Sequence, residues 1–294
     1  MRLAWIACLL CLTLLTGCAR AEPPRPLLWK VSDADNSVYL LGSFHLLRKG
    51  DYPLAASTDQ AFEDAESVVF ELSPAEMNDP ALGQMMGAAA RREDGKRLQD
   101  TLAPETWRQL EAWAQRRSVP LENLQGFEAW FVSLTISLVE MQALGLDAKM
   151  GLDRHFAQRA TEAGKPTEGL ETGAQQIALF DGMDPRLQQQ SLEDVLSDAG
   201  EMEQNINRLH ALWRQGDVAG MEAETNQRMR EEYPELYARI NRDRNLAWLP
   251  VIRKRLDRGG EDEDVLVVVS ALHLLGEDGL VRLLRDAGYT VERL

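Results

Sequence analysis

Two of the four histidines in this 294-residue sequence stand in nearly the same phrase at opposite ends of the chain. His45 lies in GSFHLL (42–47), and His273 takes the same place in SALHLL (270–275). Each phrase follows an apolar run that predicts a buried strand. Imidazole is the commonest metal ligand and also acts as an acid or base near neutral pH. The pair therefore indicates a site to which both ends of the chain contribute.

Two glutamates follow apolar runs in the same way. Glu71 ends SVVFE (67–71), and Glu171 follows PTEGL (166–170). In open α/β sheets, ligands bind beyond the carboxyl ends of the strands. Two imidazoles and two carboxylates at such ends form a nitrogen and oxygen donor set that suits Zn, Mn, Co or Fe(II) better than Cu(I).

A structural role for the same residues is an open alternative. A lone Gly-x-x-His segment arises readily by chance, so His45 and His273 can instead be strand-capping residues bonded to backbone carbonyls. Glu71 and Glu171 can likewise be ion-pair partners of Arg244 or Arg154.

The two remaining histidines differ in their surroundings. His155 lies beside Asp153, one turn into a helix expected to begin at Gly151. A helix N-terminus lowers the pKa of a nearby histidine, which favours a neutral ligand or base. His210 shares a helical face with apolar residues, so it is expected to be a core histidine.

Strands are expected at both ends of the chain. Residues 27–32 and 37–42 flank an Asp-Ala-Asp-Asn turn and predict a hairpin. The unbroken run Val265–Val269 predicts a strand buried on both faces, followed by a helix and a final strand in YTVERL (289–294). The sequence therefore predicts an α/β fold with a central mixed β-sheet formed from both ends of the chain and large helical insertions.

The insertions are expected near residues 76–150 and 185–258, where apolar residues recur at helical spacing. Aromatic and methionine residues at this spacing are expected to pack in a core rather than against a cofactor. In the first insertion the apolar residues at this spacing are Trp107, Leu110, Trp113, Ala114, Phe127, Trp130, Phe131, Leu134, Leu138 and Met141.

The N-terminal segment has the layout of a secretion signal. Residues 1–17 have a basic start and a short apolar core, and Leu-Thr-Gly-Cys resembles the lipobox of bacterial lipoproteins. Cleavage before Cys18 with lipid attachment to it, and a lipidated tether over 18–26, are expected. An ordinary signal cleaved near Ala19 or Ala21 is the alternative.

Charge and cysteine content exclude some classes of function. The formal net charge is −15 and no basic footprint is visible, so nucleic acid is not expected as a partner. Cys8 and Cys11 leave with the signal, which excludes an intrachain disulfide and a thiolate metal cluster in the folded part. After the signal, no apolar run approaches the length that crosses a bilayer.

Several motifs together resemble one known family. The segments are YLLGSFHLLRKGDYPL, AESVVFELS, GLDRHFAQRATEAGKPTEGLET, DRNLAWLPVI and VLVVVSALHLLGEDGLVRLLRDAGYTVERL. In this order they are similar to the TraB/GumN family, which is related to the Tiki metalloproteases. The resemblance spans the region 27–294.

This resemblance implies a peptidase-like fold that depends on a divalent metal, with Mn, Co or Zn as the ion. It implies His45, Glu71 and His273 as ligands. We further expect Glu171 to carry the proton and Arg244 to stabilise the oxyanion, while which of Glu71 and Glu171 is the ligand and which is the base is left open. A helix-surface ion pair is the alternative for Arg244.

Four further residues are expected beside the ligands: Asp153, His155, Asn245 and Ser270. Ser270 stands where the second motif of the family has glycine. Glycine there permits positive φ or close backbone approach, so the serine puts turnover in doubt.

The expected function is that of an envelope lipoprotein that hydrolyses peptide or protein substrates with metal-activated water. It would be anchored in the membrane through Cys18, on the outer membrane facing the periplasm if the cell has two membranes. The alternative is a catalytically inactive relative that binds or sequesters peptides or assists exopolysaccharide assembly. The oligomeric state is left open.

Overall fold

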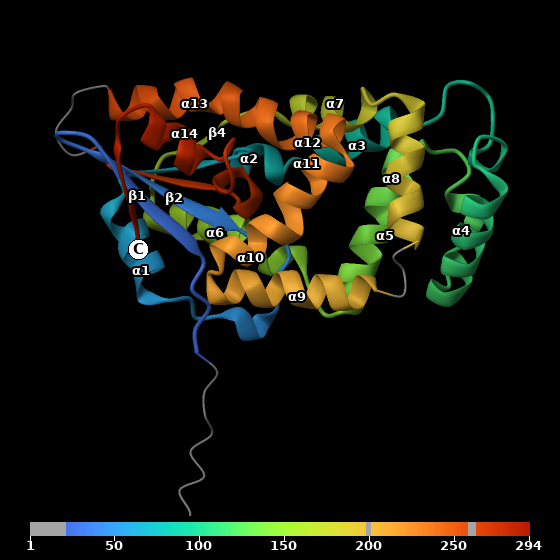
Figure 1. Ribbon diagram of the computed structural model, residues 1–294, viewed down its shortest axis with the longest axis horizontal. Helices are drawn as coiled ribbons and strands as arrows, with labels where there is room; N and C mark the ends of the chain where they lie inside the picture. Colours follow the sequence, from blue (N-terminus) through green and yellow to red (C-terminus); the bar gives the residue numbers. More distant parts are fainter. Residues whose placement is uncertain (1–21, 198–200, 258–262) are drawn as a thin grey trace, which may run out of the picture.

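The computed structural model describes residues 22–197, 201–257 and 263–294. The predicted signal over 1–17, Cys18 and the first part of the predicted tether lie outside the described residues. Figure 1 shows an elongated molecule, with the sheet at one end and a group of helices at the other.

A mixed six-stranded sheet in the order β4-β3-β5-β2-β1-β6 confirms the predicted α/β fold. Its strands β4, β3, β5 and β2 run parallel, whereas β1 is antiparallel to both of its neighbours. The strands are β1 (Leu27–Ser32), β2 (Ser37–Ser43), β3 (Ser67–Phe70), β4 (Thr167–Gly169), β5 (Val265–Ser270) and β6 (Thr290–Arg293). As predicted, the sheet contains strands from both ends of the chain.

Strand β5 joins the two ends at the centre of the sheet. It pairs with β2 on one side and β3 on the other, with Gly42 opposite Val269 and Val69 opposite Val267. A Cβ atom on Gly42 would lie 3.0 Å from Cβ of Leu27 and 3.2 Å from Cα of Ala271. Glycine at this position therefore allows the chain that follows β5 to pass close to β2.

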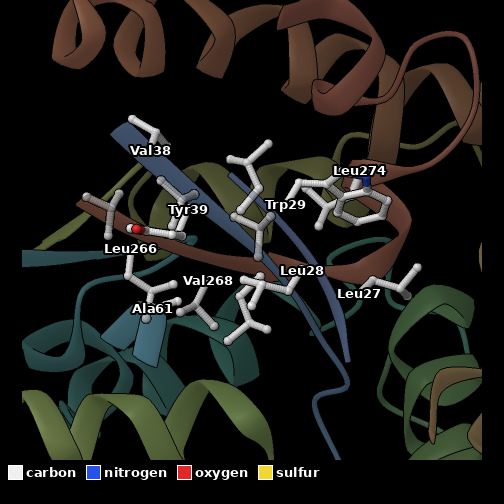
Figure 2. Packing of buried hydrophobic residues seen from close by; sticks show 14 of the residues in the cluster. Leu27, Leu28, Trp29, Val38, Tyr39, Ala61, Leu266, Val268 and Leu274 are labelled. Carbon is white, nitrogen blue, oxygen red and sulfur yellow. The ribbon is translucent and has the colours of Figure 1, made fainter. Parts of the chain in front are cut away.

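Helices cover both faces of the sheet. Helices α13 (Asp243–Leu256) and α14 (Leu280–Asp286) lie on one face, and α1 (Ala56–Asp64) and α6 (Leu152–Ala163) lie on the other (Figure 1). Figure 2 shows apolar side chains of β1, β2 and β5 filling the space between the strands and these helices. The central strands are buried on both faces, which explains their continuous apolar sequences.

A second group of helices forms its own core away from the sheet (Figure 1). Its main members are α4 (Pro104–Arg117), α5 (Ala129–Ala143) and α8 (Pro185–Ser197). The predicted face of α4 is buried at Leu110, Trp113 and Ala114. The predicted face of α5 is partly wrong, because Leu134 and Leu138 are exposed. The helix instead buries Val132 and Ile136 beside polar residues that bond to α4 and α8.

The remaining helices connect these parts. They are α2 (Pro74–Met77), α3 (Pro80–Ala89), α7 (Gly173–Asp181), α9 (Met202–Gln215), α10 (Val218–Glu222), α11 (Arg228–Glu232) and α12 (Pro234–Tyr237). Two π-helical turns, Ala223–Gln227 and Ala238–Arg242, interrupt the late helices. Of the helices in the described ranges, none is both long and apolar enough to cross a membrane.

Candidate functional site

Residues that follow four neighbouring parallel strands lie at one edge of the sheet. His45 follows β2, His273 follows β5, Glu71 follows β3 and Glu171 follows β4. The pairing of β3 with β4 continues beyond the strands, because the Glu171 amide donates to the Glu71 carbonyl at 3.1 Å. The parallel order thus brings together all four side chains that the sequence placed at strand ends.

The guanidinium of Arg244 lies at the centre of this group. From α13 it donates to Oε2 of Glu71 at 2.6 Å and to Nε2 of His273 at 3.0 Å. It also pairs with both carboxylate oxygens of Glu171. Its side chain is only 13% exposed, so the alternative of a surface ion pair is wrong. The predicted partnership of Glu71 and Glu171 with Arg244 is present in the structure.

His273 is neutral, with its proton on Nδ1. An arginine can only donate, so Nε2 must accept the hydrogen bond from Arg244. Nδ1 then donates to Oδ1 of Asn245 at 2.7 Å. Burial lowers the pKa of His273 to about 3, and the charge of Arg244 acts in the same direction. The strand-capping alternative does not hold, since both ring nitrogens bond to side chains.

A row of buried asparagines holds His273 in place. Asn245 donates to Oδ1 of Asn241 at 3.1 Å and to the Asp278 carbonyl at 2.8 Å. Asn241 and Asn226 both donate to the Leu272 carbonyl, at 3.0 and 2.7 Å. All three asparagines are at most 1% exposed. Because the carbonyl belongs to the residue before His273, this network fixes the turn that carries the imidazole.

Sequence reasoning did not single out Asn226 or Asn241. Each lies in one of the two π-helical turns, which occur frequently at functional sites. The four-residue spacing of Asn241 and Asn245 was a usable signal, because it places both side chains on one helical face. No comparable signal points to Asn226, whose contact with the turn depends on the tertiary fold.

His45 is oriented by a carboxylate. Its Nδ1 donates to Oδ2 of Asp153 at 2.8 Å, and the hydroxyl of Ser43 donates to the same oxygen. Asp153 is therefore the main cause that raises the pKa of His45, to about 9. The imidazole is 51% exposed, so solvent screens part of this interaction. The direction still favours a protonated His45 when no ion is bound.

Glu71 lies between the two imidazoles. Its Oε1 is 4.0 Å from Nε2 of His45 and 3.8 Å from Nε2 of His273. Burial alone would raise its pKa, but the positive charges of Arg244 and His45 and the amide of Ser270 lower the pKa below its usual range. His273 would add to this effect only if it were charged, and its hydrogen bond from Arg244 requires the neutral form.

Ser270 contributes its backbone to the site. Its amide donates to Oε1 of Glu71 at 2.7 Å, and its φ is −49°. A residue with negative φ has no conformational need for glycine. The backbone here therefore accommodates serine without strain, and the hydrogen bond to Glu71 is available to any residue except proline.

His155 lies apart from this group, whereas Gln176 bonds to it. His155 does not join the group: its ring packs on Tyr52 at 4.6 Å between centroids, and burial is the main cause that lowers its pKa. Gln176, which sequence reasoning missed, donates to Oε1 of Glu171 at 2.8 Å and to Oε2 of Glu71 at 3.4 Å. It lies in the first turn of α7, and Thr172 caps that helix directly after Glu171.

His45, His273 and Glu71 offer the kinds of donor atom that bind a divalent ion. Two imidazole Nε2 atoms and a carboxylate oxygen face one another, and hydrogen bonds on each Nδ1 orient the rings, as is usual for metal-binding histidines. Two ligands at tetrahedral angles would lie roughly 3.4 Å apart. In the residues that the structure describes, no three His, Cys, Asp or Glu side chains are already spaced to hold an ion. Arg244 must also release His273 before its Nε2 can serve as a ligand.

A cavity of about 290 Å³ adjoins the site and is lined by His45, Glu71 and Asp153 among other residues. Apolar side chains of Leu46 and Met77 line it as well. It leaves the exposed imidazole of His45 accessible to a molecule from outside, whereas His273 is 2% exposed. A reacting group would therefore approach from the side of His45.

Comparison with known proteins places the chain in a family. No solved structure matches it. The uncharacterized protein YbaP of Escherichia coli (strain K12) is 23% identical over 247 residues, which cover 84% of this chain and 87% of the relative. The uncharacterized protein YbaP of Shigella flexneri matches to the same extent. The family model for TraB/PrgY/gumN matches residues 27–293, and the chain therefore belongs to the TraB/PrgY/gumN family.

Proposed function

We propose that this protein is a divalent-metal-dependent hydrolase of peptide-like bonds. His45, His273 and Glu71 would hold the ion. The observation that carries the proposal is the orientation of the two imidazoles. Their Nε2 atoms lie 4.0 and 3.8 Å from the same oxygen of Glu71. The motifs resemble those of the TraB/GumN family, and the proposed relation of that family to Tiki-type metalloproteases would make a peptide bond the target. When bound, the ion would lower the pKa of a coordinated water and polarise the scissile carbonyl.

The protein's own residues prepare this centre. Asp153 and Asn245 hold the imidazoles of His45 and His273 with Nε2 directed inward. The Ser270 amide keeps Oε1 of Glu71 in place. Arg244 supplies a positive charge beside the position where an oxyanion would form, and the NH1 group released from His273 is the donor available to it.

We further propose that Glu171 accepts and returns the proton. Both of its oxygens bond to Arg244, and one also bonds to Gln176. The role therefore requires that one oxygen lose a partner when substrate binds. The same movement of Arg244 that frees His273 would free Glu171, so both changes belong to one step.

A peptide-binding protein without turnover is the second candidate. It is favoured by the way Arg244 already satisfies Glu71, Glu171 and His273 without an ion. A buried cation with this many partners costs free energy to displace. In this case the cavity beside His45 would bind a peptide while Arg244 keeps its bonds to Glu71, Glu171 and His273.

Metal content tests the first candidate against the second. We expect about one ion per chain for the wild-type protein incubated with Mn²⁺, Co²⁺ or Zn²⁺ and desalted, and none for His45→Ala or His273→Ala. His155→Ala is the matched control, since His155 lies outside the group. Equal metal in all four proteins, or none in any, would refute the site. Cleavage of a mixed peptide library by the loaded wild type then separates hydrolysis from binding.

We also propose that the chain is a lipoprotein of the cell envelope, attached through Cys18. The lipobox-like segment before Cys18 supports this location. Labelled palmitate should enter the wild-type protein in bacterial cells and not the Cys18→Ala variant. Incorporation into both proteins, or into neither, would contradict the anchor.

A further inference from the structure

The cavity beside His45 shares lining residues with a second one. The second cavity, of about 460 Å³, lies between α2 and α6. Met77 and Arg154 line both cavities. A chain-like ligand whose bond lies at His45 can therefore extend past these two side chains into the second space.

Neutral hydrogen-bond acceptors hold Arg154 between the two cavities. Its NH1 donates to Oδ1 of Asn78 at 3.1 Å, and its NH2 donates to the Met77 carbonyl at 3.4 Å. Among the described residues no carboxylate pairs with it, in contrast to Arg244. The alternative suggested by the sequence, that Arg154 forms an ion pair with Glu71 or Glu171, is thus wrong. A guanidinium has five N–H donors, so three remain for a ligand.

The second cavity carries more positive than negative charge. Lys149 and Arg154 line it together with one acidic residue, Glu162. The Glu162 carboxylate already accepts a hydrogen bond from Gln158 at 2.8 Å. A lining with a net positive charge favours ligands of negative charge.

We propose that Arg154, assisted by Lys149, binds a carboxylate of the substrate in this second cavity. The substrates would then be peptides with an anionic group a short distance from the bond at His45. The pre-oriented guanidinium, whose partners among the described residues are both neutral, matches a carboxylate, which it can bind with two parallel hydrogen bonds. This inference deepens the proposed hydrolase function, but the binding step does not depend on catalysis.

The carboxylate can come from a peptide C-terminus or from an acidic side chain. Two pairs of probes distinguish these sources. The first pair is acetyl-Ala-Ala-Ala with a free C-terminus and the same peptide as an amide. The second pair is acetyl-Ala-Glu-Ala-amide and acetyl-Ala-Gln-Ala-amide. Each pair differs only in the charged group.

Binding is measured by calorimetry on the full-length protein in detergent, without added metal and with a chelator. We expect one carboxylate probe to bind about tenfold more tightly than its neutral partner, as a charge-assisted hydrogen bond implies. Arg154→Gln should abolish this preference and Arg154→Lys should retain part of it. Arg282→Gln is the matched control, because Arg282 is an exposed arginine on α14 paired with Asp286.

Equal binding of charged and neutral probes by the wild type would overturn the inference, as would failure of all four probes to bind. A preference that survives in Arg154→Gln would overturn it too. The measurement is independent of the hydrolase proposal, because it needs neither ion nor turnover. A carboxylate preference in a protein that takes up no metal would support the subsite and reject only the hydrolase.

Discussion

The Nδ1 atom of His273 lies 2.7 Å from Oδ1 of Asn245, in a pocket where both residues are at most 2% exposed. The same asparagine donates from Nδ2 to Asn241 and to the Asp278 carbonyl. These two bonds to acceptors fix which end of the amide faces the imidazole. They therefore also fix the tautomer that leaves Nε2 directed toward Glu71.

Asn245→Ala should destabilise the protein and weaken metal binding. The substitution leaves Nδ1–H of His273 and the Asp278 carbonyl buried without these partners, which costs about 2–3 kcal/mol in the free energy of unfolding. Loss of the group that orients a ligand typically lowers metal affinity by about 10- to 100-fold. Urea denaturation and metal titration measure the two effects. Leu246→Ala is the control, because Leu246 is the adjacent residue and is 49% exposed; it should change neither quantity.

Asn226 and Asn241 should show coupled effects on stability. Both donate to the Leu272 carbonyl, so either residue alone still satisfies that oxygen. Each single alanine variant should lose about 1 kcal/mol in the free energy of unfolding. The double variant should lose more than the sum, by about 0.5–1 kcal/mol, because the carbonyl then has neither donor. Strict additivity in a double-mutant cycle would show that the shared acceptor does not outweigh the direct bond from Asn241 to Asn226.

The strand-end part of the site could be predicted from the sequence because each strand is a short apolar run. His45, Glu71, Glu171 and His273 each follow such a run, and parallel order then places them at one edge. The pairing of β2 with β5 is long-range, but a mixed sheet formed from both chain ends already implied that such strands meet.

The centre of the site could not be predicted in the same way. Arg244 lies in a charged run of α13, and such a run is typical of a solvated helix face. Only the packing of α13 over the strand ends shows that this side chain points inward. Leu134 and Leu138 show the opposite error: they have helical spacing, but α5 turns a mixed polar and apolar face toward its neighbours.

Glu71→Gln should destabilise the metal-free protein in a pH-dependent manner. The substitution removes one of the two carboxylates that neutralise buried Arg244, and breaking a buried pair costs about 3–5 kcal/mol in the free energy of unfolding. The pKa of Glu71 is lowered from its usual 4.5, so the stability it contributes is complete above 4.5 and is lost as the pH falls through the lowered pKa.

The difference in unfolding free energy between wild type and Glu71→Gln should therefore be constant between about pH 5 and 7 and shrink below about pH 4.5. Chemical denaturation with a chelator present measures it. Glu162→Gln is the control, because the Glu162 carboxylate accepts its hydrogen bond from Gln158, a neutral side chain one turn away on the same helix. A gap between wild type and Glu71→Gln that stays constant down to about pH 2.5 would contradict the low pKa.

Asp153→Asn should lower the pKa of His45. Asp153 is the main cause that raises this pKa from 6.5 to about 9, and the substitution removes its charge while keeping its shape. A raised pKa contributes stability that is present below pH 6.5 and is lost as the pH rises through the folded value. Asp153→Asn should therefore have a lower free energy of unfolding than the wild type below pH 6.5, and the difference should disappear at high pH. NMR titration of the imidazole Cε1–H signals follows His45 directly. The pKa of His155, which burial lowers, should not change; a titration of His45 that is the same in both proteins would show that Asp153 carries no charge interaction with it.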